Sequence, residues 1–126
     1  MKGMRITVLG DPRTKKNSQR LVRAGLKTIP IYSKAYEQYR DDFIRQISGD
    51  KKHGVAFPVN VKCTYFMRTR RLVDLVNLIE ATNDLLVEAG VLADDNSNII
   101  VSHDGSRVYY DKQSPRVEIE ITEAWS

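Results

Sequence analysis

The segment from Asp74 to Ala89 constrains most strongly what this chain can fold into. At about 100° per residue its apolar side chains fall within one arc, and Gly90 ends the pattern. That arc contains Leu75, Leu78, Ile79, Leu85 and Leu86, with Thr82 as its one polar member. The opposite arc is mostly acidic and contains Asp74, Asn77, Glu80, Asp84 and Glu88. The pattern predicts an amphipathic helix that packs one face on a hydrophobic core.

The flanking segments predict strands and a second helix. Ser33 is a suitable N-cap, and apolar residues recur at helical spacing from Tyr36 to Ile47. Residues 21–32 are compatible with a hairpin or an irregular flap. The predicted strands, rich in β-branched residues, are Met4–Leu9, Val59–Met67, Asn98–Ser102 and Arg116–Thr122. The expected fold class is α+β, a mixed β-sheet with two main helices packed on it.

Composition excludes several classes of protein. With 126 residues, 41% of them hydrophobic and 29% charged, the chain is expected to form a single domain over residues 1–126. One cysteine, Cys63, allows no intramolecular disulfide, and two histidines with one cysteine make no zinc-ligand set. The first residues lack a long apolar run, so we expect a cytoplasmic protein without a membrane role. A net charge of +4 suits a polyanionic partner without proving one.

Carboxylates gather near both ends of the predicted helix. Asp74 and Asn77 open it, and Asp94 and Asp95 follow it, so two short segments could bring several oxygen atoms together. Mg²⁺ prefers oxygen ligands and keeps waters that can react. Alternatively, Asp74 is a helix cap and Asp94, Asp95 and Asn96 form a turn. Spacing alone leaves both interpretations open.

Basic residues form two clusters that contain no acids of their own. The clusters are Arg13, Lys15, Lys16, Arg20, Arg23 and Lys27, and then Arg68, Arg70 and Arg71. Phosphate contacts need such charges, although a solvated loop would show the same pattern. Because the clusters flank the carboxylates, we favour contact with DNA.

The sequence from Arg70 to Leu78 reads RRLVDLVNL, and it continues through Asp84-Leu85-Leu86 and Ala89-Gly90 to Asp94-Asp95. This series resembles the signature of RusA-like Holliday junction resolvases. In that family an Asp-x-Asp-Asn-Leu-x-Lys helix start precedes an Asp-Ala-Leu, a glycine and an Asp-Asp pair. Gly10-x-Pro12 and Lys15-Lys16-Asn17-Ser18 are similar to the basic amino-terminal segment of the family.

The resemblance implies a homodimeric α+β nuclease, of phage or prophage type, that cuts four-way DNA junctions in recombination and repair. Asp74 and Asp95, with Asp94 beside it, match the aspartates that bind Mg²⁺, with Mn²⁺ as the alternative, and activate water. The implied DNA-binding residues are Arg13, Lys15, Lys16, Asn17, Arg20, Arg68, Arg70 and Arg71.

Two positions depart from the family pattern. Val76 stands where the family has its second aspartate, and Glu80 stands where it has a lysine. Either Glu80, about one helical turn after Asn77, restores a carboxylate to the metal site, or the chain binds branched DNA and cleaves it poorly. Glu80 is equally suited to be a solvent-facing helix residue.

Overall fold

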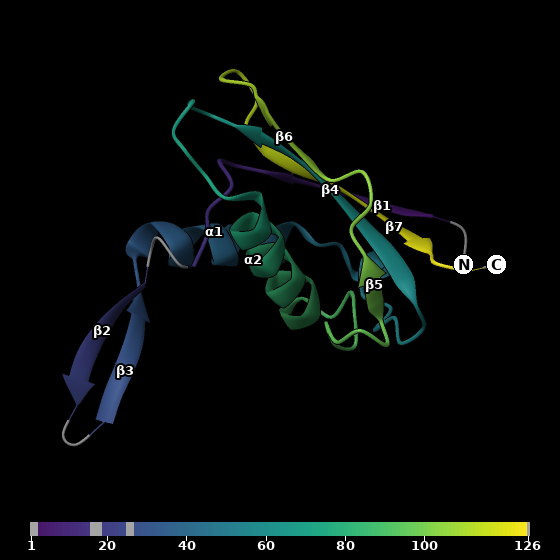
Figure 1. Ribbon diagram of the computed structural model, residues 1–126, viewed down its shortest axis with the longest axis horizontal. Helices are drawn as coiled ribbons and strands as arrows, with labels where there is room; N and C mark the ends of the chain where they lie inside the picture. Colours follow the sequence, from purple (N-terminus) through teal and green to yellow (C-terminus); the bar gives the residue numbers. More distant parts are fainter. Residues whose placement is uncertain (1–2, 16–18, 25–26, 126) are drawn as a thin grey trace.

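The computed structural model describes residues 3–15, 19–24 and 27–125. In this part of the chain, a five-stranded mixed sheet carries the helices α1 and α2 on one face, and a two-stranded hairpin stands apart (Figure 1). The predicted α+β class is confirmed.

The sheet has the order β1-β7-β4-β5, and β6 also pairs with β4, beyond the end of β5. Antiparallel pairs join β7 to β1 and to β4, whereas β5 and β6 run parallel to β4. The bounds are β1 Met4–Leu9, β4 Val59–Met67, β5 Ile100–Ser102, β6 Arg107–Tyr110 and β7 Arg116–Glu123. In β1, β4 and β7 alternate residues are buried, because one face of these strands packs under the helices.

Helix α2 (Leu75–Glu88) forms as its apolar periodicity predicts, with Asp74 as N-cap and Gly90 at φ 84° after its end. Its polar core residue, Thr82, donates a hydrogen bond to the Leu78 carbonyl at 2.9 Å and accepts one from the Tyr65 hydroxyl at 2.7 Å. Both polar groups are therefore satisfied although they are buried.

Helix α1 (Lys34–Gln46) begins at Ser33, whose Oγ accepts a hydrogen bond from the Tyr36 amide at 3.2 Å. It buries Tyr36, Tyr39 and Phe43, as predicted, and a short 3-10 turn, η1 (Gly49–Lys51), follows. The Gln46 side chain exchanges hydrogen bonds of 2.8 and 2.9 Å with the backbone of Leu9, which ties α1 to the end of β1.

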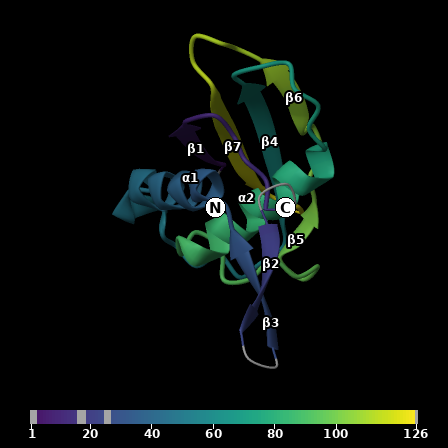
Figure 2. The ribbon, with the colours of Figure 1, turned by 90° about the vertical axis from the view of Figure 1, so that its left-hand side faces the viewer.

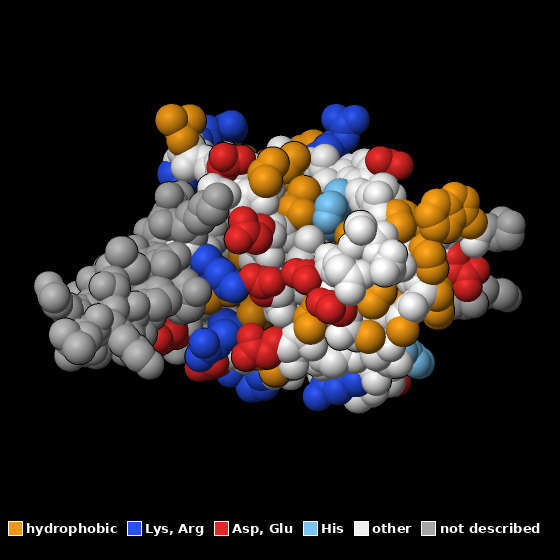
Figure 3. Space-filling model, turned by 60° about the horizontal axis from the view of Figure 1, so that its bottom comes forward, with side chains coloured by type: hydrophobic (Ala, Val, Ile, Leu, Met, Phe, Trp, Pro, Cys, Tyr) orange, Lys and Arg blue, Asp and Glu red, His pale blue; other side chains and the backbone are white. Residues whose placement is uncertain are grey.

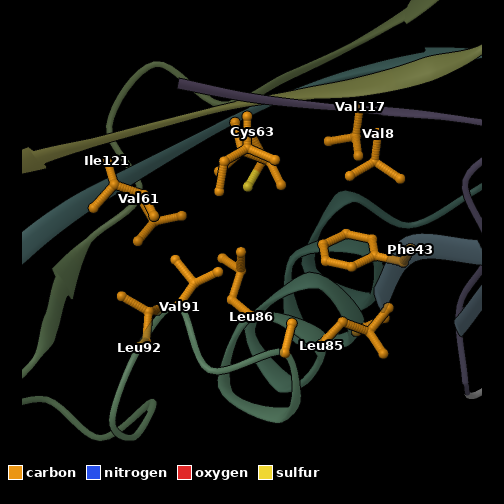
Figure 4. Close-up of a cluster of buried hydrophobic side chains, with 14 of the residues drawn as sticks. Val8, Phe43, Val61, Cys63, Leu85, Leu86, Val91, Leu92, Val117 and Ile121 are labelled. Carbon is orange, nitrogen blue, oxygen red and sulfur yellow. The ribbon is translucent and has the colours of Figure 1, made fainter. Parts of the chain in front are cut away.

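The core lies between the sheet and the helices (Figure 4). Val8 and Val117 lie next to Phe43, whereas Val61 lies beside Ile121 and points toward Val91. Cys63 is fully buried in this layer, as predicted, and burial raises the pKa of its thiol to about 12. The thiol is therefore a packing group.

Strands β2 (Gln19–Ala24) and β3 (Lys27–Tyr32) form an antiparallel hairpin, which settles the choice between hairpin and flap. The hairpin projects from the body in both ribbon views (Figures 1 and 2). It lies directly after the basic segment that contains Lys15.

Two strands differ from expectation. β5 starts at Ile100 rather than at Asn98, because the Ile99 and Ile100 amides both donate to the Asn96 carbonyl and hold the chain in a turn. β6 was not predicted, since its four residues are all exposed and show no alternation of burial. None of the described helices is long and apolar enough to cross a membrane.

Candidate active site

Three segments distant in sequence meet at Asp84, in the middle of α2. The Lys15 ammonium forms an ion pair with the Asp84 carboxylate across 69 residues of sequence. The Asp95 carboxyl also lies against Asp84. Burial, followed by the neighbouring Asp84 carboxyl, raises the pKa of Asp95 above its usual value. The arrangement is two adjacent carboxyls with one lysine cation beside them.

Acidic side chains gather on the face turned forward in Figure 3, with lysine and arginine side chains next to them. This mixture of charges is what a site for a cation and a phosphodiester requires, because the acids hold the cation and the basic groups hold the phosphate.

Asp94 holds the loop that presents Asp95. Its Oδ1 accepts a hydrogen bond from the Asp95 amide at 2.7 Å, and its Oδ2 accepts one from the Asn96 amide group at 3.1 Å. The backbone bond and the Asn96 bond lower the pKa of Asp94. Asp94 therefore loses its proton more readily than an ordinary aspartate, whereas its neighbour Asp95 loses it less readily.

Asp74 lies at the start of α2, where its Oδ1 accepts a hydrogen bond from the Val76 amide at 3.2 Å. Asp74 and Asp84 are ten residues apart in sequence, which corresponds to roughly 15 Å along a helix axis. The carboxylate is exposed and lines an open hollow with Leu72, Val73 and Asn77. The structure thus brings Asp95 to Asp84 and places Asp74 near the other end of the acidic face.

The departures from the family pattern both face solvent. Val76 is 68% exposed, outside the apolar arc as predicted. Glu80 is exposed one helical turn before Asp84, a spacing at which side chains on a helix are neighbours. Its predicted role as a metal ligand stays a prediction.

The two basic clusters converge on one carboxylate that sequence reasoning passed over. Asp11 Oδ2 pairs with Arg71 at 2.8 Å and with Arg13 at 3.6 Å, and its Oδ1 accepts the Arg68 amide at 2.9 Å. Arg71 also donates to the Pro12 carbonyl at 2.8 Å. The carboxylate that offsets the positive charge of these clusters lies outside them in the sequence. Asp11 thereby brings Arg13, Arg68 and Arg71 together.

A second polar link supports α2 behind Asp84. His103 Nδ1 lies 2.8 Å from the Val61 carbonyl, so this nitrogen donates and Nε2 is left to accept from the Asn83 amide at 3.2 Å. His103 is thus part of a connection from β4 to Asn83, the helix residue that precedes Asp84.

Three of the predicted DNA-binding residues have no described side chain. Lys16 and Asn17 lie outside the described residues, and Arg20 belongs to β2, of which only the backbone is described. Sequence reasoning gave Asp84 no metal-binding role, although Asp84-Leu85-Leu86 resembles the Asp-Ala-Leu of the family. That match, and the position of Asp84 four residues after Glu80 in the acidic arc, were the available signals.

Among residues 3–15, 19–24 and 27–125, no three histidine, cysteine, aspartate or glutamate side chains are arranged to hold a metal ion. Mg²⁺ is commonly held by one or two carboxylates, with waters and substrate phosphates completing its shell. The adjacent Asp84 and Asp95 carboxyls fit that requirement, because a cation there would relieve the contact between like charges.

Comparison with known proteins gives a family match. The family model described as Endodeoxyribonuclease RusA matches residues 10–122, a range that contains Lys15, Asp84 and Asp95. No curated protein matches the chain.

Proposed function

The chain belongs to the RusA family of endodeoxyribonucleases, and from this premise we propose that Asp84 and Asp95 hold the Mg²⁺ ion of its active site. The family consists of metal-dependent Holliday junction endodeoxyribonucleases, whose substrate is branched DNA. The observation that carries the proposal is the contact between the Asp84 and Asp95 carboxyls beside Lys15. Mn²⁺ is the alternative ion, since it takes the same oxygen ligands.

The remaining predicted residues have roles around this pair. Asp94 keeps the loop in the shape that presents Asp95, and it supplies a second ionised carboxylate there. Glu80 is a further proposed ligand, one turn from Asp84. Asp74 stays a proposed ligand as well, but for a separate ion at the start of α2, because it lies too far along the helix from Asp84 to share one.

When bound, the ion would neutralise charge on the scissile phosphate and lower the pKa of a bound water. The protein's own residues do the rest. Asp84 and Asp95 supply oxygen atoms, and Lys15 offsets their charge until a phosphate provides another partner for the ammonium group. No side-chain nucleophile is required.

DNA contact is proposed for the residues gathered around Asp11. Arg13, Arg68 and Arg71 form one basic surface that reaches toward Lys15. Arg70, Lys16, Asn17 and Arg20 are proposed to extend it, because they belong to the same two segments. Such contacts would position the phosphate backbone and carry no base specificity.

A single domain over residues 1–126 and a homodimer complete the proposal. Resolving a four-way junction takes two coordinated nicks, and a twofold dimer supplies two equivalent sites.

Val76 favours a second candidate function, a branched-DNA-binding protein that cleaves weakly. An exposed apolar residue stands where the family has an aspartate, so the site has one carboxylate fewer than the family pattern. In this alternative the fold and the basic surface are kept for binding.

A labelled four-way junction incubated with and without Mg²⁺ tests both candidates. We expect the wild-type protein to cleave the junction only when Mg²⁺ is present. Asp95→Asn and Asp84→Asn should each abolish cleavage, while gel shifts show that both variants still bind the junction. Asp104→Asn, an exposed carboxylate outside the site, is the matched control. A wild-type protein that binds the junction without cutting it would support the second candidate, and cleavage by both active-site variants would remove the metal assignment.

A further inference from the structure

Strand β6 carries an aromatic surface that the proposed site does not use. Val108 and Tyr110 pair with Tyr65 and Met67 of β4, so they point to the helix-covered side of the sheet. They are nevertheless 38% and 40% exposed, because β6 is an edge strand. Together with Arg70 and Val73 they line a hollow of about 470 Å³, called here the Tyr110 hollow. Its volume falls in the range of small-molecule sites, roughly 300–1,000 Å³.

A cation without a carboxylate partner covers part of this hollow. The Arg70 guanidinium lies over the Tyr110 ring, 4.2 Å from its centroid. Within the described part of the chain, Arg70 makes no ion pair. A stacked guanidinium keeps its in-plane N–H groups available, which suits a phosphate.

The opposite face of β4 and β6 also has an arginine over an aromatic ring, but that arginine is paired with carboxylates. There Tyr109 stacks on Phe66 at 5.5 Å, and Arg116 lies 3.9 Å over Phe66. Arg116, however, pairs with Asp111 at 3.0 Å and with Glu118 at 2.7 Å. The Arg116 charge is neutralised by these two carboxylates, whereas Arg70 on the Tyr110 side makes no ion pair within the described residues.

The Tyr110 hollow adjoins the hollow at the start of α2, which contains the proposed ligand Asp74. Val73 lines both this hollow and the one that contains Asp74 at the start of α2. Arg71 lines it too, and Arg71 pairs with Asp11 in the basic surface. A DNA strand that follows the basic surface toward α2 therefore passes the aromatic ring.

We propose that the Tyr110 hollow binds an unpaired nucleotide of the branched DNA, with its base against Tyr110 and Val108 and its phosphate on Arg70. This inference rests on the proposed function. At this hollow, branched DNA would be distinguished from duplex by an unpaired base whose face is exposed. An aromatic face is useful only to a base whose own face is exposed, and bases of an intact duplex are covered by their neighbours. Stacking tolerates any sequence, because every base has a π-face.

The test compares affinities of a four-way junction, a single strand and a linear duplex of matched sequence, by fluorescence anisotropy in EDTA, where no cleavage intervenes. Tyr110→Leu keeps apolar bulk and removes the ring, so it should weaken junction and single-strand binding at least about fivefold and leave duplex binding unchanged. Tyr110→Phe should bind like the wild type. Phe66→Leu, the matched change on the opposite face of the sheet and outside the lining of the hollow, should have no effect on the three affinities.

Arg70→Gln provides a second measurement that does not depend on the ring. It should reduce the log-log salt slope of junction binding by about one, because the variant makes one phosphate contact fewer than the wild type. Unchanged junction affinity in Tyr110→Leu, an equal loss of affinity for duplex, or an equal loss in Phe66→Leu would each overturn the proposal. The nucleotide-binding proposal and the metal-site proposal can fail independently. The affinities that test the first are measured without metal, whereas the metal site is tested by the loss of cleavage in Asp95→Asn.

Discussion

Asp95 combines a proposed metal-binding role with an unfavourable electrostatic environment. Burial and the Asp84 carboxyl raise its pKa, so the folded protein binds the Asp95 proton more tightly than the unfolded chain does. Stability therefore falls as pH rises from the ordinary aspartate pKa through the raised one, and the full loss is present above both. In the absence of metal, this carboxylate opposes folding at neutral pH.

Asp95→Asn should consequently stabilise the metal-free protein at pH 7 while it removes cleavage. The gain in the free energy of unfolding should shrink on acidification and vanish near pH 3, below the ordinary aspartate pKa of about 3.9. Urea unfolding in EDTA at the two pH values measures it, with Asp104→Asn as control. A variant less stable than the wild type at pH 7 would contradict the electrostatic account of this site.

Thr82 is the polar residue in the apolar arc of α2, and its hydroxyl is the buried partner of Tyr65. Thr82→Val keeps the shape and leaves the Tyr65 hydroxyl without this acceptor, which should cost about 1–3 kcal/mol of unfolding free energy. The double variant with Tyr65→Phe should recover part of the loss. Urea titration of the single and double variants measures it, and strict additivity would mean that the two hydroxyls do not interact.

The family pattern and the local charge clusters gave roles to some site residues and not to others. Asp95 and Lys15 received roles in this way, whereas Asp84 was noted in the family signature and in the acidic arc without a metal-binding role. Its importance comes from contacts with two segments far away in sequence, and helical periodicity carries no information on such contacts. Asp11 was missed for the same reason, since its partner Arg71 lies 60 residues later.

At the scale of elements, both departures from the family pattern lie on the solvent-exposed face of α2, where the fold tolerates substitution. Val76 is 68% exposed, so an aspartate there should cost little folding energy. Val76→Asp combined with Glu80→Lys should raise the rate of junction cleavage, because it restores the family's carboxylate and its cation together. Single-turnover cleavage of labelled junction gives the rate.

Glu80→Lys alone separates the roles left open for Glu80. Loss of activity would identify it as a ligand, whereas unchanged activity would identify a surface residue. A folded double variant that binds junctions and cuts no faster than the parent would show that Val76 does not limit the reaction.

The long elements were predictable because local pattern and tertiary environment agree. α1, α2, β1, β4 and β7 each show the period of their structure in their own residues. β5 and β6 have three and four residues, and they exist because both pair with β4. A strand that depends on its partner for order leaves little local signal, so β6 and its aromatic surface were missed.

At the scale of the whole molecule, the basic surface follows the carboxyl end of β1, whereas the turn η1 lies near the other end of that strand. Arg13→Gln with Arg68→Gln should flatten the log-log salt dependence of junction binding by about 0.9 for each phosphate contact that the substitutions remove. Lys51→Gln, on η1, should leave the slope unchanged and serves as control. Titrations over a range of salt concentrations give the slopes. Equal slopes for the double variant and the wild type would mean that these arginines are merely solvated.

If Asp84 holds the metal ion as proposed, its ion pair with Lys15 competes with that ion. A metal ion entering at Asp84 would displace an internal counterion, and the energy of that displacement would be subtracted from its affinity. A DNA phosphate that accepts the Lys15 ammonium would remove this subtraction in advance. Metal and DNA would then be coupled thermodynamically, each raising the affinity of the other by the same factor. A nuclease built in this way would hold its ion weakly until a substrate strand is in place.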